Sequence, residues 1–141
     1  MVSFRITRNV AVIASMSAAL CVPALAEPLL QPSHQGNVTY ISGGVGLDEQ
    51  NALKADAHEY DLAISNSNRA GQFTTGTALT IDTTGGRSIL QVSKTGPLFY
   101  AQLPPGNYVI HAMNEGQQRT REVRVGRTAS ADIHLIWPQN G

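Results

Sequence analysis

The chain has 141 residues, 10 basic and 10 acidic side chains and a formal net charge of zero. This length predicts one domain with at most a short appended segment. The hydrophobic share of 42% is enough to build a core and excludes a disordered chain. The charge balance argues against nucleic acid as a partner, because binding to nucleic acid requires an excess of basic residues. The single cysteine excludes a disulfide framework.

The first 26 residues have the pattern of a secretory signal peptide. Arg5 and Arg8 precede a mostly apolar run over 10–22, and an Ala-x-Ala cleavage site ends at Ala26. The run is shorter than the roughly 20 residues that cross a bilayer. We therefore expect export to the periplasm or the exterior, cleavage after Ala26 and no transmembrane segment in the mature chain. Two alternatives stay open: a buried N-terminal helix, and a lipoprotein anchored at Cys21, although the residues before Cys21 fit a lipobox poorly.

Two short segments follow the cleavage site. Residues 27–37 hold two prolines and a glycine and are predicted to be an irregular leader. Residues 38–61 are predicted to form a strand, a turn and a helix. The strand covers 38–42, where β-branched and aromatic residues gather, and a glycine-rich turn ends it. The turn lacks the spacing of a phosphate-binding loop, so we interpret it as a tight connection.

The helix of this segment is predicted over 48–60. Acidic residues lie in its first turn, where the helix dipole favours them. Its apolar side is one narrow stripe made of Leu53, Ala57 and Tyr60.

From residue 62 onward the hydrophobic period changes to two, which is typical of half-buried strands. Seven such segments, separated by turn signals, lie at 62–64, 79–82, 88–93, 99–103, 108–112, 123–125 and 133–137. No helical pattern joins them, which argues against a parallel sheet. We therefore predict a mainly β fold, a seven-stranded antiparallel, immunoglobulin-like β-sandwich over 62–137 with one N-terminal helix, and 138–141 as a tail.

The alternation also predicts which side chains enter the core. The residues expected to be buried are Ile81, Phe99, Leu103, Tyr108, Ile110, Val123, Val125, Leu135 and Trp137. Those expected to be more exposed are Thr80, Arg124 and His134. Four apolar residues fall on outer faces instead: Leu98, Tyr100, Val109 and Ile136. Either the helix covers one of these faces or they form a partner surface, and the narrow helical stripe favours the helix.

The strongest turn signal lies in the stretch Leu103-Pro104-Pro105-Gly106-Asn107-Tyr108-Val109-Ile110, followed downstream by Gly116. This stretch resembles the carboxypeptidase regulatory-like domain, a transthyretin-like (prealbumin-type) β-sandwich, whose pattern is Leu-x-Pro-Gly-x-Tyr followed by a hydrophobic residue and a glycine turn. Residues 40–62 resemble a companion segment of small exported bacterial proteins of this kind.

The motif carries structural expectations but no particular function. Leu103 should end a core strand, and Pro105-Gly106 should make a tight hairpin. Tyr108 should begin the return strand with its ring in the core.

The sequence offers little for catalysis or metal binding. Cleavage would remove the single cysteine and with it thiol chemistry and Cys-ligated metals. No serine lies in a Gly-x-Ser-x-Gly elbow, and no histidine has a second ligand at a recognised spacing. The C-terminal sequence also differs from the Tyr-Arg-Gly-Ser ending of the transthyretin-like hydroxyisourate hydrolases. We predict a non-enzymatic protein with no catalytic residue, metal or cofactor, and a weak hydrolase is kept as an alternative.

Binding candidates are therefore sought on the surface. The first set is Arg119, Arg121 and Arg124, which suits an unknown protein or an anionic envelope ligand. The second is His111 and His134. By parity both lie on the outer faces of their strands, and if those strands were neighbours the two histidines could form a surface metal pair. The simpler interpretation is a solvated, aggregation-resisting strand for the arginines and two solvated surface residues for the histidines. A structural subunit that assembles through sheet edges is the remaining alternative.

Overall fold

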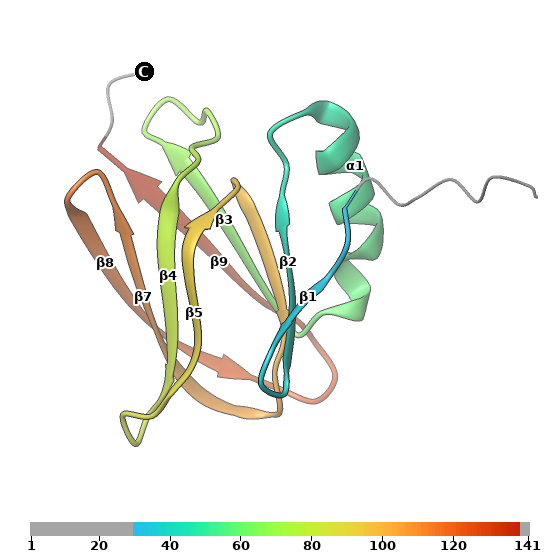
Figure 1. Cartoon of the computed structure of the whole chain (residues 1–141), viewed down its shortest axis with the longest axis vertical. Coiled ribbons are helices and arrows are strands. Elements are labelled where there is room, and N and C mark those ends of the chain that lie inside the picture. The colour runs from blue at the N-terminus through green and yellow to red at the C-terminus, as the bar shows by residue number, and fades with distance from the viewer. Residues whose placement is uncertain (1–29, 139–141) are drawn as a thin grey trace, which may run out of the picture.

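The computed structural model describes residues 30–138, which form two facing β-sheets and one short helix (Figure 1). The predicted signal peptide lies outside the described residues. The elements in chain order are β1 (Ser33–Gln35), β2 (Val38–Gly43), α1 (Leu47–Asp56), the 3-10 turn η1 (Ala57–Glu59), β3 (Leu62–Asn68), β4 (Thr77–Thr83), β5 (Ser88–Thr95), β6 (Leu98–Gln102), β7 (Gly106–Asn114), β8 (Gln117–Val125) and β9 (Ala131–Trp137).

The strand order is β1-β2-β6-β3-β9 in one sheet and β5-β4-β7-β8 in the other. The mainly β, two-sheet architecture with one helix is thus confirmed, but residues 30–138 contain nine strands rather than seven. One additional strand, β1, lies in the predicted leader. The other, β2, belongs to the segment 38–61 that was placed before the sandwich, and it is paired with β6 inside the first sheet.

Strand β1 was missed because it has no alternating apolar residues. It is an edge strand that pairs only with β2, and its side chains are largely exposed. The signal that could have found it is the dipeptide Gly36-Asn37, which joins the two strands as a two-residue turn. Gly36 adopts φ of 57°, the left-handed region that such turns require at glycine.

The expectation of a wholly antiparallel sandwich is wrong at one pair. Strand β3 pairs antiparallel with β6 but parallel with β9, in register from Leu62 with Ala131 to Asn68 with Trp137. A parallel pair needs a long connection but not a helical one. Here the chain between the two strands forms β4 to β8, which belong to both sheets, and this supplies that length.

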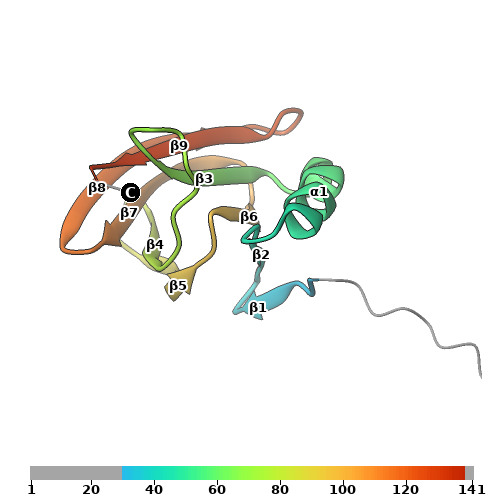
Figure 2. The same ribbon diagram turned by 90° about the horizontal axis from the view of Figure 1, so that it is seen from above.

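The predicted helix is present as α1 and η1, and it lies on the side of the first sheet that faces away from the second (Figure 2). Leu53 and Tyr60 pack against the outward side chains Ile41, Leu98 and Tyr100. This confirms that the helix covers the outward apolar residues of β6, so β6 is buried on both faces. None of the helices in residues 30–138 is long and apolar enough to cross a membrane.

The core between the sheets is the one predicted from alternation. All the residues expected to be buried are buried, except Val123, which is half-buried and packs against the core. Of the residues expected to be more exposed, Arg124 and His134 are exposed and Thr80 is half-buried. Ile136 is not covered by the helix and remains 50% exposed.

The predicted hairpin at Pro105-Gly106 is wrong. Strand β6 lies in the first sheet and β7 in the second, so residues 103–105 carry the chain from one sheet to the other. Prolines have no N–H to offer a ladder, which suits a crossing segment. The backbone N–H of Leu103 instead donates to the Asp61 carboxylate at 2.9 Å.

Tyr108 fixes this crossing. Its ring is buried and its hydroxyl donates to the carbonyl oxygen of Pro104 at 2.6 Å. Burial, together with the nearby Asp61 carboxylate, raises the pKa of the Tyr108 hydroxyl above its ordinary value, so it keeps the proton that it donates. This arrangement is known as a tyrosine corner: a buried tyrosine at a connection between two sheets, whose hydroxyl is hydrogen-bonded to the backbone a few residues upstream.

Gly96 and Gly116 are among the glycines that the backbone requires. Gly96 lies in the connection from β5 to β6, where the backbone passes close to Gly43. A Cβ atom at Gly96 would lie 2.6 Å from the Gly43 carbonyl oxygen. Gly116 has φ of 77° in the two-residue turn from β7 to β8, beside Glu115 at 48°. The predicted glycine turn at Gly116 is therefore confirmed.

One end of the sandwich interior is polar. Its buried residues are Asn66, Asn68, Thr74, Thr77, Thr95 and Asn114. The indole N–H of Trp137 donates to the Asn66 side-chain oxygen at 3.1 Å, and the Asn114 amide donates to Thr77 at 2.8 Å. These directional bonds hold this end together with apolar packing. Among the described residues, the Asn66 side-chain nitrogen and the Thr74 hydroxyl are buried without a hydrogen-bond partner.

We predict that Tyr108→Ala lowers the free energy of unfolding by about 3–5 kcal/mol through loss of a buried ring. Tyr108→Phe should cost only about 1 kcal/mol, the value of its hydrogen bond to Pro104. Chemical denaturation measures both. Tyr40→Phe is the control. The Tyr40 ring stacks on Phe99 with 5.6 Å between ring centroids, and its hydroxyl is not part of a connection between the two sheets. Equal stability of the native protein and Tyr108→Phe would show that the corner bond contributes nothing.

Candidate functional site

The three arginines of the predicted patch do not form one surface. Strand β8 alternates, and Arg119 and Arg121 face the same side as the core residues Ala112 and Ile110 of β7, their register partners. Arg124 points to the opposite, outer face. The proposed patch is therefore split between two faces, because residues an odd number of positions apart lie on opposite sides of a strand.

Arg119 acts on the core rather than on solvent. Its guanidinium carbon lies 5.6 Å from the ring centroid of Trp137, which is fully buried. A guanidinium over an indole face makes a cation–π contact, and the aliphatic stem covers apolar surface. Arg119 thus closes the side of the sandwich where β8 and β9 meet.

Arg121 is exposed and faces the open side of an edge strand. An inward-pointing charge on an edge strand opposes pairing with a further strand. This position favours the interpretation of β8 as a solvated, protected edge over that of a binding strand.

The two histidines lie on different sheets. His111 is on the outer face of the second sheet, with Nε2 3.2 Å from the Asp82 carboxylate and Nδ1 3.4 Å from the Thr120 hydroxyl. His134 is on the outer face of the first sheet. The expectation that their strands are neighbours is wrong, so a metal pair between them is not possible. Residues 30–138 hold no group of three His, Cys, Asp or Glu side chains placed to bind a metal ion.

His134 has a partner that the sequence did not reveal. Its Nε2 lies 2.6 Å from the hydroxyl oxygen of Ser67, on the adjacent strand β3. Nucleophilic serines need substrate access and a carboxylate that orients the histidine. Ser67 is only 2% exposed, and within residues 30–138 no hydrogen bond joins His134 to a carboxylate. The pair therefore serves to hold the imidazole in place.

The glycine-rich turn before α1 is a tight connection, as expected. The Glu49 carboxylate accepts the N–H of Gly44 at 3.0 Å, and the Gln50 amide donates to the Gly44 carbonyl at 2.9 Å. The Glu49 carboxylate thus occupies the Gly44 N–H, one of the donors that a phosphate would need, and places a negative charge beside it.

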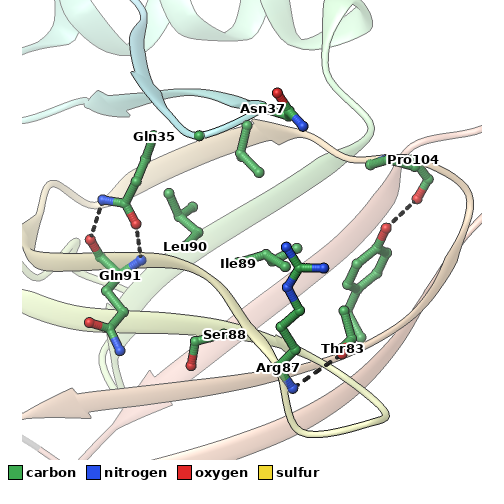
Figure 3. A pocket seen from close by; sticks show the side chains of 12 residues that line it. Gln35, Asn37, Thr83, Arg87, Ser88, Ile89, Leu90, Gln91 and Pro104 are labelled. Atoms are coloured by element: carbon green, nitrogen blue, oxygen red, sulfur yellow. Dashed lines mark hydrogen bonds between the residues drawn. The ribbon is translucent and has the colours of Figure 1, made fainter.

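A hollow lies at one end of the sandwich, and we name it the end cleft (Figure 3). It is open on one side and has a volume of about 670 Å³. Its lining residues come from the β1–β2 hairpin, the β4–β5 hairpin and the tyrosine corner: Gln35, Gly36, Asn37, Val38, Thr83, Arg87, Ser88, Ile89, Leu90, Gln91, Pro104 and Tyr108.

One wall of the end cleft is held by a side-chain clamp. The Gln35 amide donates to the Gln91 carbonyl oxygen at 2.9 Å, and its own oxygen accepts the Gln91 N–H at 2.7 Å (Figure 3). Gln35 thereby bonds to the edge strand β5 as a neighbouring strand would, and it ties the β1–β2 hairpin of the first sheet to the second. The wall is therefore preformed.

Arg87 is the charged residue in the lining of the end cleft. Its backbone is fixed by the turn, where Thr83 N–H donates to the Arg87 carbonyl at 2.8 Å. Its side chain is exposed and makes no ion pair within residues 30–138. Sequence reasoning missed it because Arg87 stands alone in a turn and its cleft partners lie far away in the chain.

No protein-family model and no curated protein matches this sequence. Among solved structures, the Bacillus anthracis TIE protein is similar at 18% identity and a TM-score of 0.43, over 55% of this chain. The match spans about 15% of that protein's length. This similarity is too distant to carry an argument about fold or function.

We predict that Arg119→Ala exposes Trp137, the single tryptophan of the chain. Tryptophan fluorescence should shift to longer wavelength, and the free energy of unfolding should fall by about 1 kcal/mol from the lost cation–π contact and packing. Arg124→Ala removes an equal charge from the outer face of the same strand and should change neither. Identical emission spectra for Arg119→Ala and the native protein would contradict the contact.

Proposed function

We propose that this protein is an exported, non-enzymatic binding module whose site is the end cleft and whose ligand is a small amphipathic anion. The observation that carries the proposal is Arg87, an unpaired guanidinium at a partly apolar, preformed hollow. Binding sites typically combine an apolar lining with a few placed polar groups.

The lining matches such a ligand at two points. Val38, Ile89 and Leu90 offer apolar contact for the ligand body. A planar guanidinium recognises carboxylate, sulfonate or phosphate oxygens in a paired geometry. No carboxylate lines the end cleft, so an anion meets no opposing charge there.

The proposal is tested with anilinonaphthalene sulfonate, a fluorescent amphipathic anion. Arg87→Gln should weaken its binding about tenfold, the loss of one charge-assisted interaction. Arg87→Lys should restore part of the affinity, because the charge returns without the paired geometry. The fluorescence titration is run beside thermal unfolding of each variant.

Arg124→Gln is the matched control, since it removes an exposed arginine that is not in the end cleft. Its affinity should equal that of the native protein. If Arg87→Gln binds the probe as tightly as the native protein does, the end cleft is not the site.

Export is part of the proposal and rests on the N-terminal sequence pattern. Expression of the full chain in a bacterial host should place the protein in the periplasm or medium, with cleavage after Ala26. Mass spectrometry of the exported protein should find Glu27 first. A product that keeps residues 1–26, or one acylated at Cys21, would overturn this part.

We further propose that the chain is a carboxypeptidase regulatory-like, transthyretin-like module. The two facing sheets and the tyrosine corner at the Leu103–Tyr108 stretch support this assignment. The two alternative functions have less support. Assembly through sheet edges is opposed by inward Arg121 on β8 and by the Gln35 clamp on β5. A hydrolase is disfavoured by the burial of Ser67, the serine paired with a histidine.

A further inference from the structure

A second hollow lies on the outer face of the first sheet, beside the helix, and we name it the helix groove. Helix α1 and η1 cover the β2 and β6 part of this face and reach Ala63 of β3, while Asp132, His134 and Ile136 of β9 stay exposed. Figure 2 shows the helix at this side of the first sheet. The groove has a volume of about 570 Å³. Its lining residues are Lys54, Ala57, His58, Ala63, Ile64, Ser65, Phe73, Leu98, Tyr100, Ser130, Asp132 and His134.

The floor of the helix groove is apolar and aromatic. Leu98 and Tyr100 come from β6 and Ala63 from β3. The ring of Tyr100 is fixed from behind by Tyr60, at 5.9 Å between ring centroids. Burial and the nearby Asp132 carboxylate raise the pKa of the Tyr100 hydroxyl, which therefore remains a hydrogen-bond donor.

Phe73 is held at the edge of the groove with its side chain 40% exposed. Its backbone forms a bridge with Ser67 of β3. The loop before it is fixed by the Asn68 side-chain oxygen, which accepts the N–H groups of Ala70 and Gln72 at 3.0 and 2.9 Å. An exposed aromatic ring on a hydrogen-bonded loop is available for stacking on a ligand.

The polar groups of the helix groove carry both signs of charge. Lys54 lies on the helix side and Asp132 on the β9 side, and neither makes an ion pair within residues 30–138. The charges of the lining cancel, so the groove favours a neutral ligand that forms many hydrogen bonds.

The hydrogen-bonding groups are also preorganised. His134 is held by Ser67 through the 2.6 Å contact, and the His58 ring nitrogen contacts the Ala55 carbonyl at 3.0 Å. Groups that are already oriented lose less conformational freedom when a ligand binds.

We propose that the helix groove binds a neutral saccharide. Its exposed aromatic ring, Phe73, suits the C–H face of a sugar ring, and its carboxylate, imidazole and hydroxyl groups suit sugar hydroxyls. This site is separate from the end cleft and does not depend on the function proposed there, since the two hollows share no lining residue.

The test uses nuclear magnetic resonance of the isotope-labelled protein with three disaccharides: maltose, cellobiose and diacetylchitobiose. At least one should shift the backbone amide signals of Ser65, Phe73, Asp132 and His134. Asp132→Asn, which preserves shape, and Phe73→Ser, which removes the exposed ring, should each weaken that binding about tenfold.

Ile136→Ala is the matched control, because Ile136 is exposed on the same face of β9 and does not line the groove. It should bind as the native protein does, and so should Arg87→Gln. That last result separates this site from the end cleft.

Two outcomes would overturn the proposal. One is that none of the disaccharides shifts the groove signals, or that they shift only those of the end cleft. The other is that tetramethylammonium or acetate shifts the groove signals while the sugars do not, which would show a charged ligand class.

Discussion

Strand β6 imposes the constraint on which the rest of the structure depends. It is central in one sheet, while its neighbours in sequence, β5 and β7, lie in the other. The chain must therefore cross the sandwich immediately before and immediately after it. Gly96 makes the first crossing possible by its lack of a side chain, and the hydrogen bond from Tyr108 to Pro104 fixes the second. The end cleft has the second crossing in its wall, so the fold and the proposed site share one structural cause.

The sequence predicts local structure well where one physical rule dominates. Alternation identifies the core positions, because each sheet buries one face, and the narrow Leu53, Ala57 and Tyr60 stripe predicts a helix that covers the outer face of β6. The same rules cannot tell a turn within one sheet from a crossing between two. Pro105-Gly106 fits both, and only the pairing of distant strands decides between them.

The candidate sites were harder to foresee for a related reason. The closely spaced arginines of β8 predicted one basic patch. Because side chains alternate along a strand, Arg119 contacts Trp137 and Arg124 lies on the opposite face. Arg87 lines the end cleft and Asp132 lines the helix groove. In each hollow some of the other lining residues come from strands that are far away in the sequence. The Ser67–His134 contact joins residues that are 67 positions apart and carries no sequence signature.

The parallel pairing of β3 with β9 has a consequence for how the chain reaches its folded state. Trp137 of the last strand bonds to Asn66, which lies 71 positions earlier, so the first sheet is completed by the final residues of the domain. Contacts of such long separation slow folding, because the intervening loop must close before they form. A chain still emerging from the ribosome, with β9 not yet made, leaves β3 with β6 as its one strand neighbour. It also lacks the indole that fills the core. Completion of the first sheet therefore waits until β9 has been synthesised.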